Sequence, residues 1–303
     1  MSILDSIGNT PMVEIAKIHQ NHKVRILAKL EGANPAGSVK DRIAYYMIKK
    51  ALEGGALTRE KTVLEATSGN TGIGLGMVCA AYGLKLKLTM PECVSFERRR
   101  ILEAFGAELV LTDPARGTDG AIRRAREIFE ANPDRYFLAN QFDNGNNPLA
   151  HYETTGKEIW EQTAGQVTHF VAGMGTTGTL MGAGRRLREY NRQVQVIGVE
   201  PVIGHKIQGL KNMNESILPS IYDPDKLKRI ITVLDEEAFQ TARRLTVEEG
   251  IFVGMSSGAA LAGALKLAPD LPAGSTIVTV LPDRGERYLS TALFSSICAQ
   301  CPP

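Results

Sequence analysis

Apolar and polar positions along the chain follow two alternating patterns, which predict a regular series of strands and helices. Short apolar or alternating runs predict strands at residues 24–30, 62–66, 85–90, 108–111, 136–138, 167–172, 194–199 and 276–281. Apolar residues at helical spacing predict helices at residues 40–52, 71–82, 96–105, 119–130, 156–162, 180–190, 236–249 and 257–267. Strands and helices that alternate at such short spacing are typical of α/β proteins with doubly wound, mostly parallel sheets.

The length and the loops of the chain favour two domains. Its 303 residues are enough for one large or two ordinary domains. The loop at residues 143–148, which is rich in asparagine and ends in proline, is the best candidate for a domain boundary. We therefore expect two α/β domains, with the cleft between them as the default place for a site.

Composition and charge exclude several classes of protein. The chain is 43% hydrophobic and 22% charged, which is ordinary for a soluble globular protein, and its net charge of +2 gives no case for binding nucleic acid or a charged membrane. The basic run 98–100 lies beside glutamates and is expected to be a solvated helix face. No apolar run reaches the roughly 18 residues of a membrane span, and the amino terminus has no signal-peptide pattern. We expect a cytoplasmic protein.

The cysteines do not make the disulfide framework of a small secreted protein. They are Cys79, Cys93, Cys298 and Cys301. The pair Cys298-x-x-Cys301 has no second pair to complete the roughly four ligands of a structural zinc site. We expect it to be a tail without a function, with a redox or metal role as the alternative.

Lys40 stands where a turn runs into a predicted helix. Pro35 and Gly37 mark the turn, and Ser38 can cap the helix. A cation in the first turn of a helix opposes the helix dipole, so this position favours a neutral amine that can attack a carbonyl. On the base rate for charged side chains, a solvated surface lysine is the competing interpretation.

A first turn of small and polar residues, 66–72, lies between a predicted strand and a predicted helix. It offers hydroxyl and amide groups at a helix amino terminus, which suits a carboxylate or another anion. These groups belong to Thr67, Ser68, Asn70 and Thr71. An ordinary capped turn is the alternative.

A second turn, residues 173–179, matches G-x-G-x-x-G. Glu200 ends the next predicted strand at about the distance expected of a ribose-binding acid, so a dinucleotide site is one interpretation. The loop also carries Thr176, Thr177 and Thr179, whose hydroxyls suit a terminal phosphate better than a bridging pyrophosphate. The loop alone leaves both interpretations open.

A third turn, residues 254–258, matches the G-x-S-x-G nucleophile elbow. That fold needs a histidine after the serine, and the last histidine here is His205, so Ser256 is better interpreted as a hydrogen-bonding group at a helix start. No histidine has the spacing of a metal ligand, so we expect surface or satisfied core roles for His19, His22, His151, His169 and His205.

Taken together, these motifs resemble one family. The chain is similar to the fold-type-II pyridoxal-phosphate enzymes and, within them, to the B-type branch of the cysteine synthase (O-acetylserine sulfhydrylase) family. The resemblance runs nearly end to end and rests on residues 7–11, 29–31, 34–42, 67–72, 141–142, 175–179, 205–209, 254–258 and 285–291.

The resemblance implies a role for each motif. Lys40 would hold pyridoxal 5'-phosphate as a Schiff base and act as acid and base, Asn70 would bind the ring hydroxyl, and Ser256 would face the pyridine nitrogen. The phosphate would be held by Gly175, Thr176, Thr177, Gly178 and Thr179. The substrate's α-carboxylate would be held by Thr67, Ser68, Asn70, Thr71 and Gln141.

It also implies an organisation and a reaction. Residues 1–34 and 146–303 would form a larger phosphate-binding domain, and residues 35–145 a smaller mobile domain that closes on the carboxylate. A homodimer is expected, with a small-molecule amino acid and a sulfur donor as partners. The reaction would be β-replacement on O-acetylserine or O-phosphoserine through an aminoacrylate, giving L-cysteine with sulfide, thiosulfate or a sulfur carrier. A hydroxyl at the ring nitrogen does not keep it protonated, and the weaker electron sink suits loss of a β-leaving group.

Two details bear on the branch and the substrate. The third residue of the phosphate loop is Thr177, where the A-type enzymes usually have glycine. Lys211 lies near the position of an arginine in relatives that take anionic sulfur donors or O-phosphoserine, and a lysine supplies only a point charge there.

Three other functions compete with cysteine synthesis. A cystathionine β-synthase-like enzyme would use homocysteine. A nicotinamide-dependent oxidoreductase would leave Lys40 and Ser256 unexplained. A non-catalytic binding protein would not need Lys40, Asn70 and Ser256 together.

Overall fold

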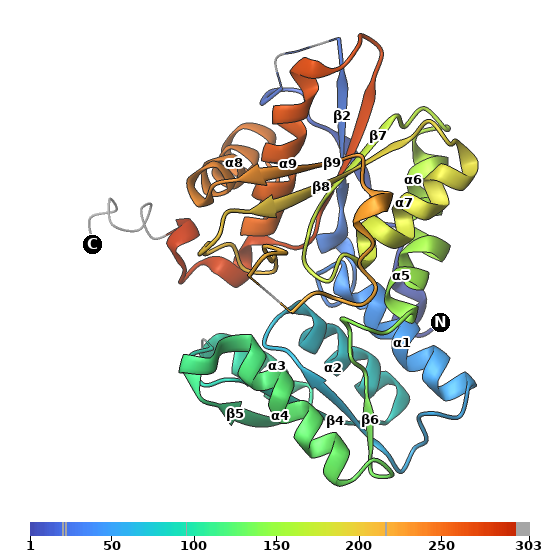
Figure 1. Ribbon diagram of the computed structural model, residues 1–303, viewed down its shortest axis with the longest axis vertical. Coiled ribbons are helices and arrows are strands. Elements are labelled where there is room, and N and C mark those ends of the chain that lie inside the picture. The colour runs from blue at the N-terminus through green and yellow to red at the C-terminus, as the bar shows by residue number, and fades with distance from the viewer. Residues whose placement is uncertain (20, 22, 95, 216, 295–303) are drawn as a thin grey trace. The chain divides into compact units, whose positions relative to one another are not determined.

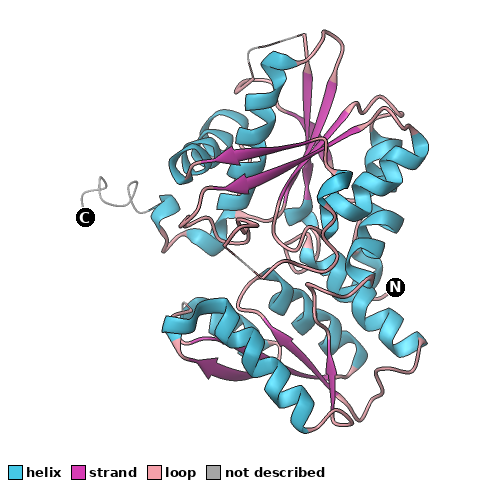
Figure 2. Ribbon diagram, in the orientation of Figure 1, coloured by secondary structure: helices cyan, strands magenta, loops and turns pink. Residues whose placement is uncertain are grey.

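The structure is a computed structural model that describes residues 1–19, 21, 23–94, 96–215 and 217–294. The chain divides into two compact units. Unit 1 comprises Met1–Ile7 and Asn34–Ala150, and unit 2 comprises Gly8–Ala33 and the described residues from His151 onward. Each unit is a sheet flanked by helices (Figure 1 and Figure 2). The domain limits and the domain motion expected from the sequence remain predictions.

Unit 1 is built on a four-stranded parallel sheet. In spatial order its strands are β5 (Glu108–Thr112), β4 (Lys85–Pro91), β3 (Thr62–Ala66) and β6 (Tyr136–Leu138). Its helices are α1 (Lys40–Glu53), α2 (Asn70–Tyr82), α3 (Phe96–Ala104), α4 (Gly117–Ala131) and α5 (Asn146–Ala150). The strands predicted from the sequence agree with these four to within one residue.

The two faces of this sheet are covered by different helices. Val63 of β3 lies in a core with Ile43 of α1 and Leu75 of α2. Leu64, the next residue, lies in a separate core with Ala121 of α4. Successive side chains of a strand point to opposite faces, so α1 and α2 cover one face of the sheet and α4 the other.

Unit 2 is built on a six-stranded sheet, and only its edge strand β1 is antiparallel to its neighbour. In spatial order the strands are β1 (Met12–Glu14), β2 (Arg25–Leu30), β10 (Thr276–Leu281), β7 (His169–Gly173), β8 (Gln195–Pro201) and β9 (Arg229–Val233). Its helices are α6 (Gly156–Gln162), α7 (Gly178–Tyr190), α8 (Asp235–Glu249) and α9 (Met255–Leu267), and a π-helical segment, η4 (His151–Thr155), precedes α6.

The core of unit 2 lies on this sheet. All six residues of β10 are buried, as expected of a parallel strand covered on both faces. The sequence patterns predicted neither β1 nor β9, and they did not predict α5. The longest helices described have 15 residues, so none of them is long enough to cross a bilayer, which takes about 20 residues.

Short 3-10 helices complete the secondary structure. They are η1 (Ile3–Ser6), η2 (Glu31–Ala33), η3 (Pro114–Arg116), η5 (Pro224–Lys226), η6 (Ala268–Asp270) and η7 (Gly285–Tyr288).

Candidate active site

Lys40 is the first residue of α1 and follows a turn fixed by its neighbours. Gly37 turns the chain with a φ of +83°, which glycine adopts without strain. Ser38 Oγ accepts a hydrogen bond from the main-chain N–H of Lys40 at 3.2 Å and donates to the buried Asp41 carboxylate at 3.3 Å. Ser38 therefore supports the helix start as predicted, although the N-cap position itself belongs to Val39.

A glycine lets α2 approach the first turn of α1. A Cβ atom at Gly74 would lie 3.2 Å from the carbonyl oxygen of Lys40 and 3.2 Å from Cβ of Ala44. This spacing is tighter than ordinary contacts, so a larger residue would push the helices apart. Close packing of the helices holds the start of α1 in a fixed place in unit 1.

The polar turn before α2 presents a helix amino terminus. Gly69 is the N-cap and no side chain caps the helix there. Thr67 Oγ1 accepts from the N–H of Gly69 at 3.3 Å, and Thr71 Oγ1 donates to Gln141 Oε1 at 2.7 Å. An uncapped amino terminus with adjacent hydroxyls favours an anion. Unit 1 thus gathers the predicted carboxylate-binding residues Thr67, Ser68, Asn70, Thr71 and Gln141.

The phosphate loop expected from the sequence connects β7 to α7 in unit 2. Thr177 is the N-cap of α7 and has a φ of +68°, an uncommon conformation for a β-branched residue. Its buried Oγ1 has no hydrogen-bond partner among the described residues. The N–H of Gly178 donates to Thr176 Oγ1 at 3.5 Å. The loop therefore combines a helix amino terminus with an unsatisfied buried hydroxyl.

A second loop of unit 2 lies against this one. A Cβ atom at Gly175 would lie 2.6 Å from the carbonyl oxygen of Gly209, so the main chains touch. A Cβ atom at Gly209 would in turn lie 3.8 Å from Oγ of Ser256, which is buried in the first turn of α9. The structure thus brings the predicted phosphate loop and Ser256 against the same short loop, at Gly209.

Lys211 follows the same loop. Its main-chain N–H donates to the carbonyl oxygen of Met174 at 2.8 Å, which ties the residue to the start of the phosphate loop. Glu200, the acid of the dinucleotide interpretation, accepts a hydrogen bond from the N–H of Met213 at 3.4 Å.

His151 supports the phosphate loop and was not singled out by the sequence patterns. Its ring is buried, with Nδ1 2.9 Å from Thr155 Oγ1 and Nε2 3.2 Å from Thr179 Oγ1. The expectation of a satisfied core histidine is confirmed for this residue, but its contact with Thr179 gives it a part in the site. This role in supporting the loop is visible only in the contact between His151 and Thr179, which are 28 residues apart in the sequence.

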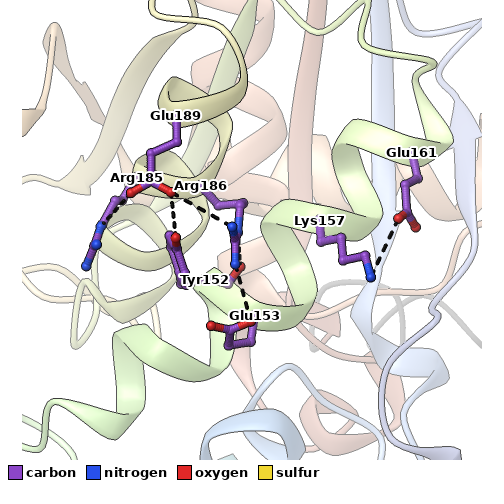
Figure 3. Close-up of polar contacts among 7 residues, drawn as sticks. All are labelled: Tyr152, Glu153, Lys157, Glu161, Arg185, Arg186 and Glu189. Atoms are coloured by element: carbon purple, nitrogen blue, oxygen red, sulfur yellow. Dashed lines mark hydrogen bonds and ion pairs between the residues drawn. The ribbon is translucent and has the colours of Figure 1, made fainter.

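A cluster of charged and aromatic side chains fastens η4 to α7 (Figure 3). The guanidinium Cζ of Arg186 lies 3.6 Å from the ring centroid of Tyr152, and its NH2 lies 3.2 Å from Glu153. Tyr152 donates its hydroxyl hydrogen to Glu189 at 2.5 Å. Because η4 carries His151, this cluster holds His151 against the helix that begins at the phosphate loop.

The other histidines and cysteines that the structure describes differ in their burial and contacts. His19 Nε2 is 2.9 Å from the carbonyl oxygen of Val24, and His169 is buried, which lowers its pKa. Burial also lowers the pKa of His205. Cys79 is a buried free thiol, and burial raises its pKa to about 12, whereas Cys93 is exposed. The residues His22, Cys298 and Cys301 lie outside the part of the chain that the structure describes.

Comparison with known proteins identifies the family. Residues 3–283 match the family described as pyridoxal-phosphate dependent enzyme. The chain belongs to this family. A cysteine synthase of Aquifex aeolicus is 51% identical over 97% of this chain and 92% of its own length. Cysteine synthase B of Salmonella typhimurium is 45% identical over 95% of this chain and 94% of its own length. The pyridoxal-phosphate enzyme described here is thus a member of the cysteine synthase family, as predicted.

Solved structures agree with this assignment. O-acetyl serine sulfhydrylase isoform 3 from Entamoeba histolytica superposes with a TM-score of 0.91 at 41% identity, over 97% of this chain and 91% of that one. O-ureido-L-serine synthase superposes with a TM-score of 0.92 at 41% identity, over 98% and 95%. The predicted fold class is confirmed, and the nicotinamide interpretation of the glycine-rich loop is not supported.

The described residues fit the cofactor of this family. The orphaned hydroxyl of Thr177 and the amino terminus of α7 suit a phosphate group. The amine of Lys40 suits an aldehyde. The buried hydroxyl of Ser256 offers a neutral partner for a ring nitrogen.

Proposed function

We propose that this enzyme forms L-cysteine by β-replacement on O-acetyl-L-serine, with sulfide as the sulfur donor. One observation carries the proposal. In a chain of the cysteine synthase family, Lys40 is the first residue of α1, and the loop before α7 contains the buried Thr177 hydroxyl without a hydrogen-bond partner among the described residues. O-phosphoserine, thiosulfate and a sulfur carrier are the alternatives for the leaving group and the donor. When bound, pyridoxal phosphate withdraws electrons from the substrate's α-carbon and so allows a β-substituent to leave.

Lys40 has two tasks in this proposal. Its Nζ would hold the cofactor's aldehyde carbon until the substrate's amino group displaces it, and the freed amine would then take the proton from the substrate's α-carbon. The buried Asp41 and Ser38 fix the turn that positions the lysine. Because the amine must be aimed at one carbon, this rigidity is part of its function.

The phosphate loop and Ser256 would hold the cofactor in one orientation. Its phosphate would be bound by main-chain and hydroxyl donors of Gly175, Thr176, Thr177, Gly178 and Thr179. Ser256 would offer its hydroxyl to the ring nitrogen, and Asn70 would hydrogen-bond the ring hydroxyl. A hydroxyl does not force a proton onto the ring nitrogen, which favours loss of a leaving group over reactions that need a longer-lived carbanion.

The turn before α2 binds the amino-acid substrate by its α-carboxylate. Donors come from Thr67, Ser68, Asn70, Thr71 and Gln141. Closure of residues 35–145 over this carboxylate is part of the proposal, because excluding water protects a reactive intermediate from hydrolysis. The assembly we propose is a homodimer in the cytoplasm, and light scattering of the purified protein tests the dimer.

The experiment compares the wild type with Lys40→Ala. The wild type, loaded with pyridoxal phosphate, should absorb visible light and should release L-cysteine from O-acetylserine and sulfide. Borohydride reduction followed by peptide mass spectrometry should place the cofactor on Lys40. The Lys40→Ala variant should lose turnover and the lysine-linked absorption. A colourless wild type after incubation with the cofactor, or normal turnover by the variant, contradicts the proposal.

Substrate choice is settled by steady-state kinetics. O-acetylserine and O-phosphoserine are each compared with sulfide, thiosulfate and homocysteine. A higher kcat/KM with homocysteine than with sulfide would assign the chain to cystathionine formation instead. A Lys211→Ala variant tests whether this lysine serves an oxyanion, since thiosulfate and O-phosphoserine should lose affinity while sulfide and O-acetylserine should not.

A further inference from the structure

Glu65 is a buried acid to which the proposed function gives no role. It is the fourth residue of β3 and is 2% exposed. Strand alternation places its side chain on the same face as Val63, toward α1 and α2. Burying a carboxyl group is costly unless its oxygens are hydrogen-bonded, so its partners indicate what it does.

Gln141 contacts both oxygens of this carboxyl group. Its Nε2 lies 3.2 Å from Glu65 Oε1, and its main-chain N–H lies 3.4 Å from Glu65 Oε2. The carbonyl oxygen of Gln141 also accepts from Asn147 Nδ2 at 2.7 Å. The glutamine is therefore held by its main chain and by its side chain at once.

These contacts fix which way the Gln141 amide points. An ionised carboxylate only accepts hydrogen bonds, so in its ionised form Glu65 requires the NH2 group of Gln141, which lies 3.2 Å from its Oε1. The amide oxygen then faces Thr71, whose hydroxyl donates to it at 2.7 Å. One hydrogen of Nε2 is used by Glu65 and the second is left for another acceptor.

We propose that Glu65 is a positioning residue that orients the Gln141 amide and thereby sets the affinity for the substrate's α-carboxylate. This inference rests on the proposed function, in which Gln141 and Thr71 bind that carboxylate. Without Glu65 the amide is free to rotate, and the reversed orientation presents a carbonyl oxygen to an anion. Glu65 acts through Gln141 and does not itself touch the substrate.

The experiment measures substrate affinity separately from turnover. Glu65→Gln should raise the KM for O-acetylserine and the Kd for L-cysteine about tenfold, the effect of losing one oriented hydrogen bond to a charged group. The Kd is followed by the cofactor's visible absorption. The KM for sulfide and the spectrum of the resting enzyme should not change. Glu65→Asp, whose carboxylate is one methylene shorter, should act in the same direction and replaces Glu65→Gln if that variant does not fold.

A double-mutant cycle separates positioning from general damage. In a Gln141→Ala background there is no amide to orient, so Glu65→Gln should have no further effect on either constant. Thr89→Val is the matched control. It removes a buried hydrogen bond of 2.8 Å on the neighbouring strand β4 and should leave both constants unchanged.

The outcomes distinguish this inference from the proposed function. If the wild type neither binds L-cysteine nor converts O-acetylserine, the proposed function fails and the inference fails with it. If the wild type does both and Glu65→Gln is indistinguishable from it, only the inference is overturned. It is also overturned if Glu65→Gln weakens binding equally in the wild-type and Gln141→Ala backgrounds.

Discussion

Gly175 lies so close to Gly209 that a Cβ atom on Gly175 would sit 2.6 Å from the Gly209 carbonyl oxygen. Main-chain atoms cannot move aside as a flexible side chain can. The contact therefore sets the distance between the phosphate loop and the loop that packs beside Ser256. Glycine is required at residue 175 because of this contact.

The first prediction concerns that contact. Gly175→Ala should displace one of the two loops, lower the affinity for pyridoxal phosphate at least about tenfold and destabilise the protein by roughly 1–3 kcal/mol, as overpacking does. Cofactor titration and urea unfolding measure the two effects. Gly145→Ala is the control, since a Cβ atom there meets no atom within 4 Å and the residue is exposed. Equal cofactor affinity of the two variants would show that the contact is not needed.

The second prediction uses the orphaned hydroxyl of Thr177. Thr177→Val keeps the shape but removes the hydroxyl, so the cofactor-free protein should be more stable by about 1–2 kcal/mol because no unpaired polar group is buried. The rise in Tm on adding pyridoxal phosphate should shrink, because the hydroxyl no longer binds the phosphate.

The control for Thr177 is a second buried hydroxyl of the same kind. Thr279 Oγ1 on β10 also has no hydrogen-bond partner among the described residues. Thr279→Val should stabilise the cofactor-free protein and leave the cofactor-induced rise in Tm intact. If both variants respond to the cofactor alike, the Thr177 hydroxyl does not bind the phosphate.

The sequence predicted those parts of the fold whose signal is local. The four strands of unit 1 have apolar runs that can be recognised without their partners, and so does β10. In contrast, β1 has no fully buried residue and ends in the exposed Glu14, and in β9 only Ile231 and Val233 are buried. With so little apolar pattern of their own, these two strands are stabilised by the neighbouring strand.

The site residues likewise fall into those with a local sequence signal and those without one. Lys40 and the phosphate loop are local motifs, in which turn residues and helix starts lie next to one another in the sequence. The supporting residues are not local. Glu65 reaches Gln141 across 76 residues because β3 pairs with β6, and His151 reaches Thr179 only because η4 packs on α7. Tertiary contacts of this kind leave no mark at a fixed spacing.

The third prediction concerns the cluster that fastens η4 to α7. Arg186→Met should lower the free energy of unfolding by roughly 1–2 kcal/mol. The variant lacks the close cation–π contact with the Tyr152 ring and the 3.0 Å hydrogen bond to the Tyr152 carbonyl oxygen. Cofactor affinity should also fall, since His151 is held by the same segment. The exposed neighbour Arg185 pairs with Glu189 at 3.0 Å, and Arg185→Met should cost under about 0.5 kcal/mol. Equal losses in urea unfolding would contradict this account.

The fourth prediction follows from the burial of Glu65, which raises its pKa from 4.5 to about 7, although hydrogen bonds from Gln141 and from the main chain at Asn140 and Ala66 oppose the rise. Between these values the folded protein holds a proton that the unfolded chain has released. Folding stability therefore falls as pH rises from about 4.5 to about 7, and the loss is on the order of 3 kcal/mol.

Glu65→Gln cannot ionise and should lack this loss. The free energy of unfolding of the wild type, minus that of the variant, should be larger at pH 5 than at pH 8 by up to about 3 kcal/mol. Subtracting the variant cancels the titration of all other groups, provided that their surroundings are unchanged. Thr89→Val, which removes a buried hydroxyl and no ionisable group, should show the same pH dependence as the wild type. A difference between wild type and Glu65→Gln that stays constant from pH 5 to pH 8 would mean that Glu65 is ionised throughout, held by its hydrogen bonds with Gln141.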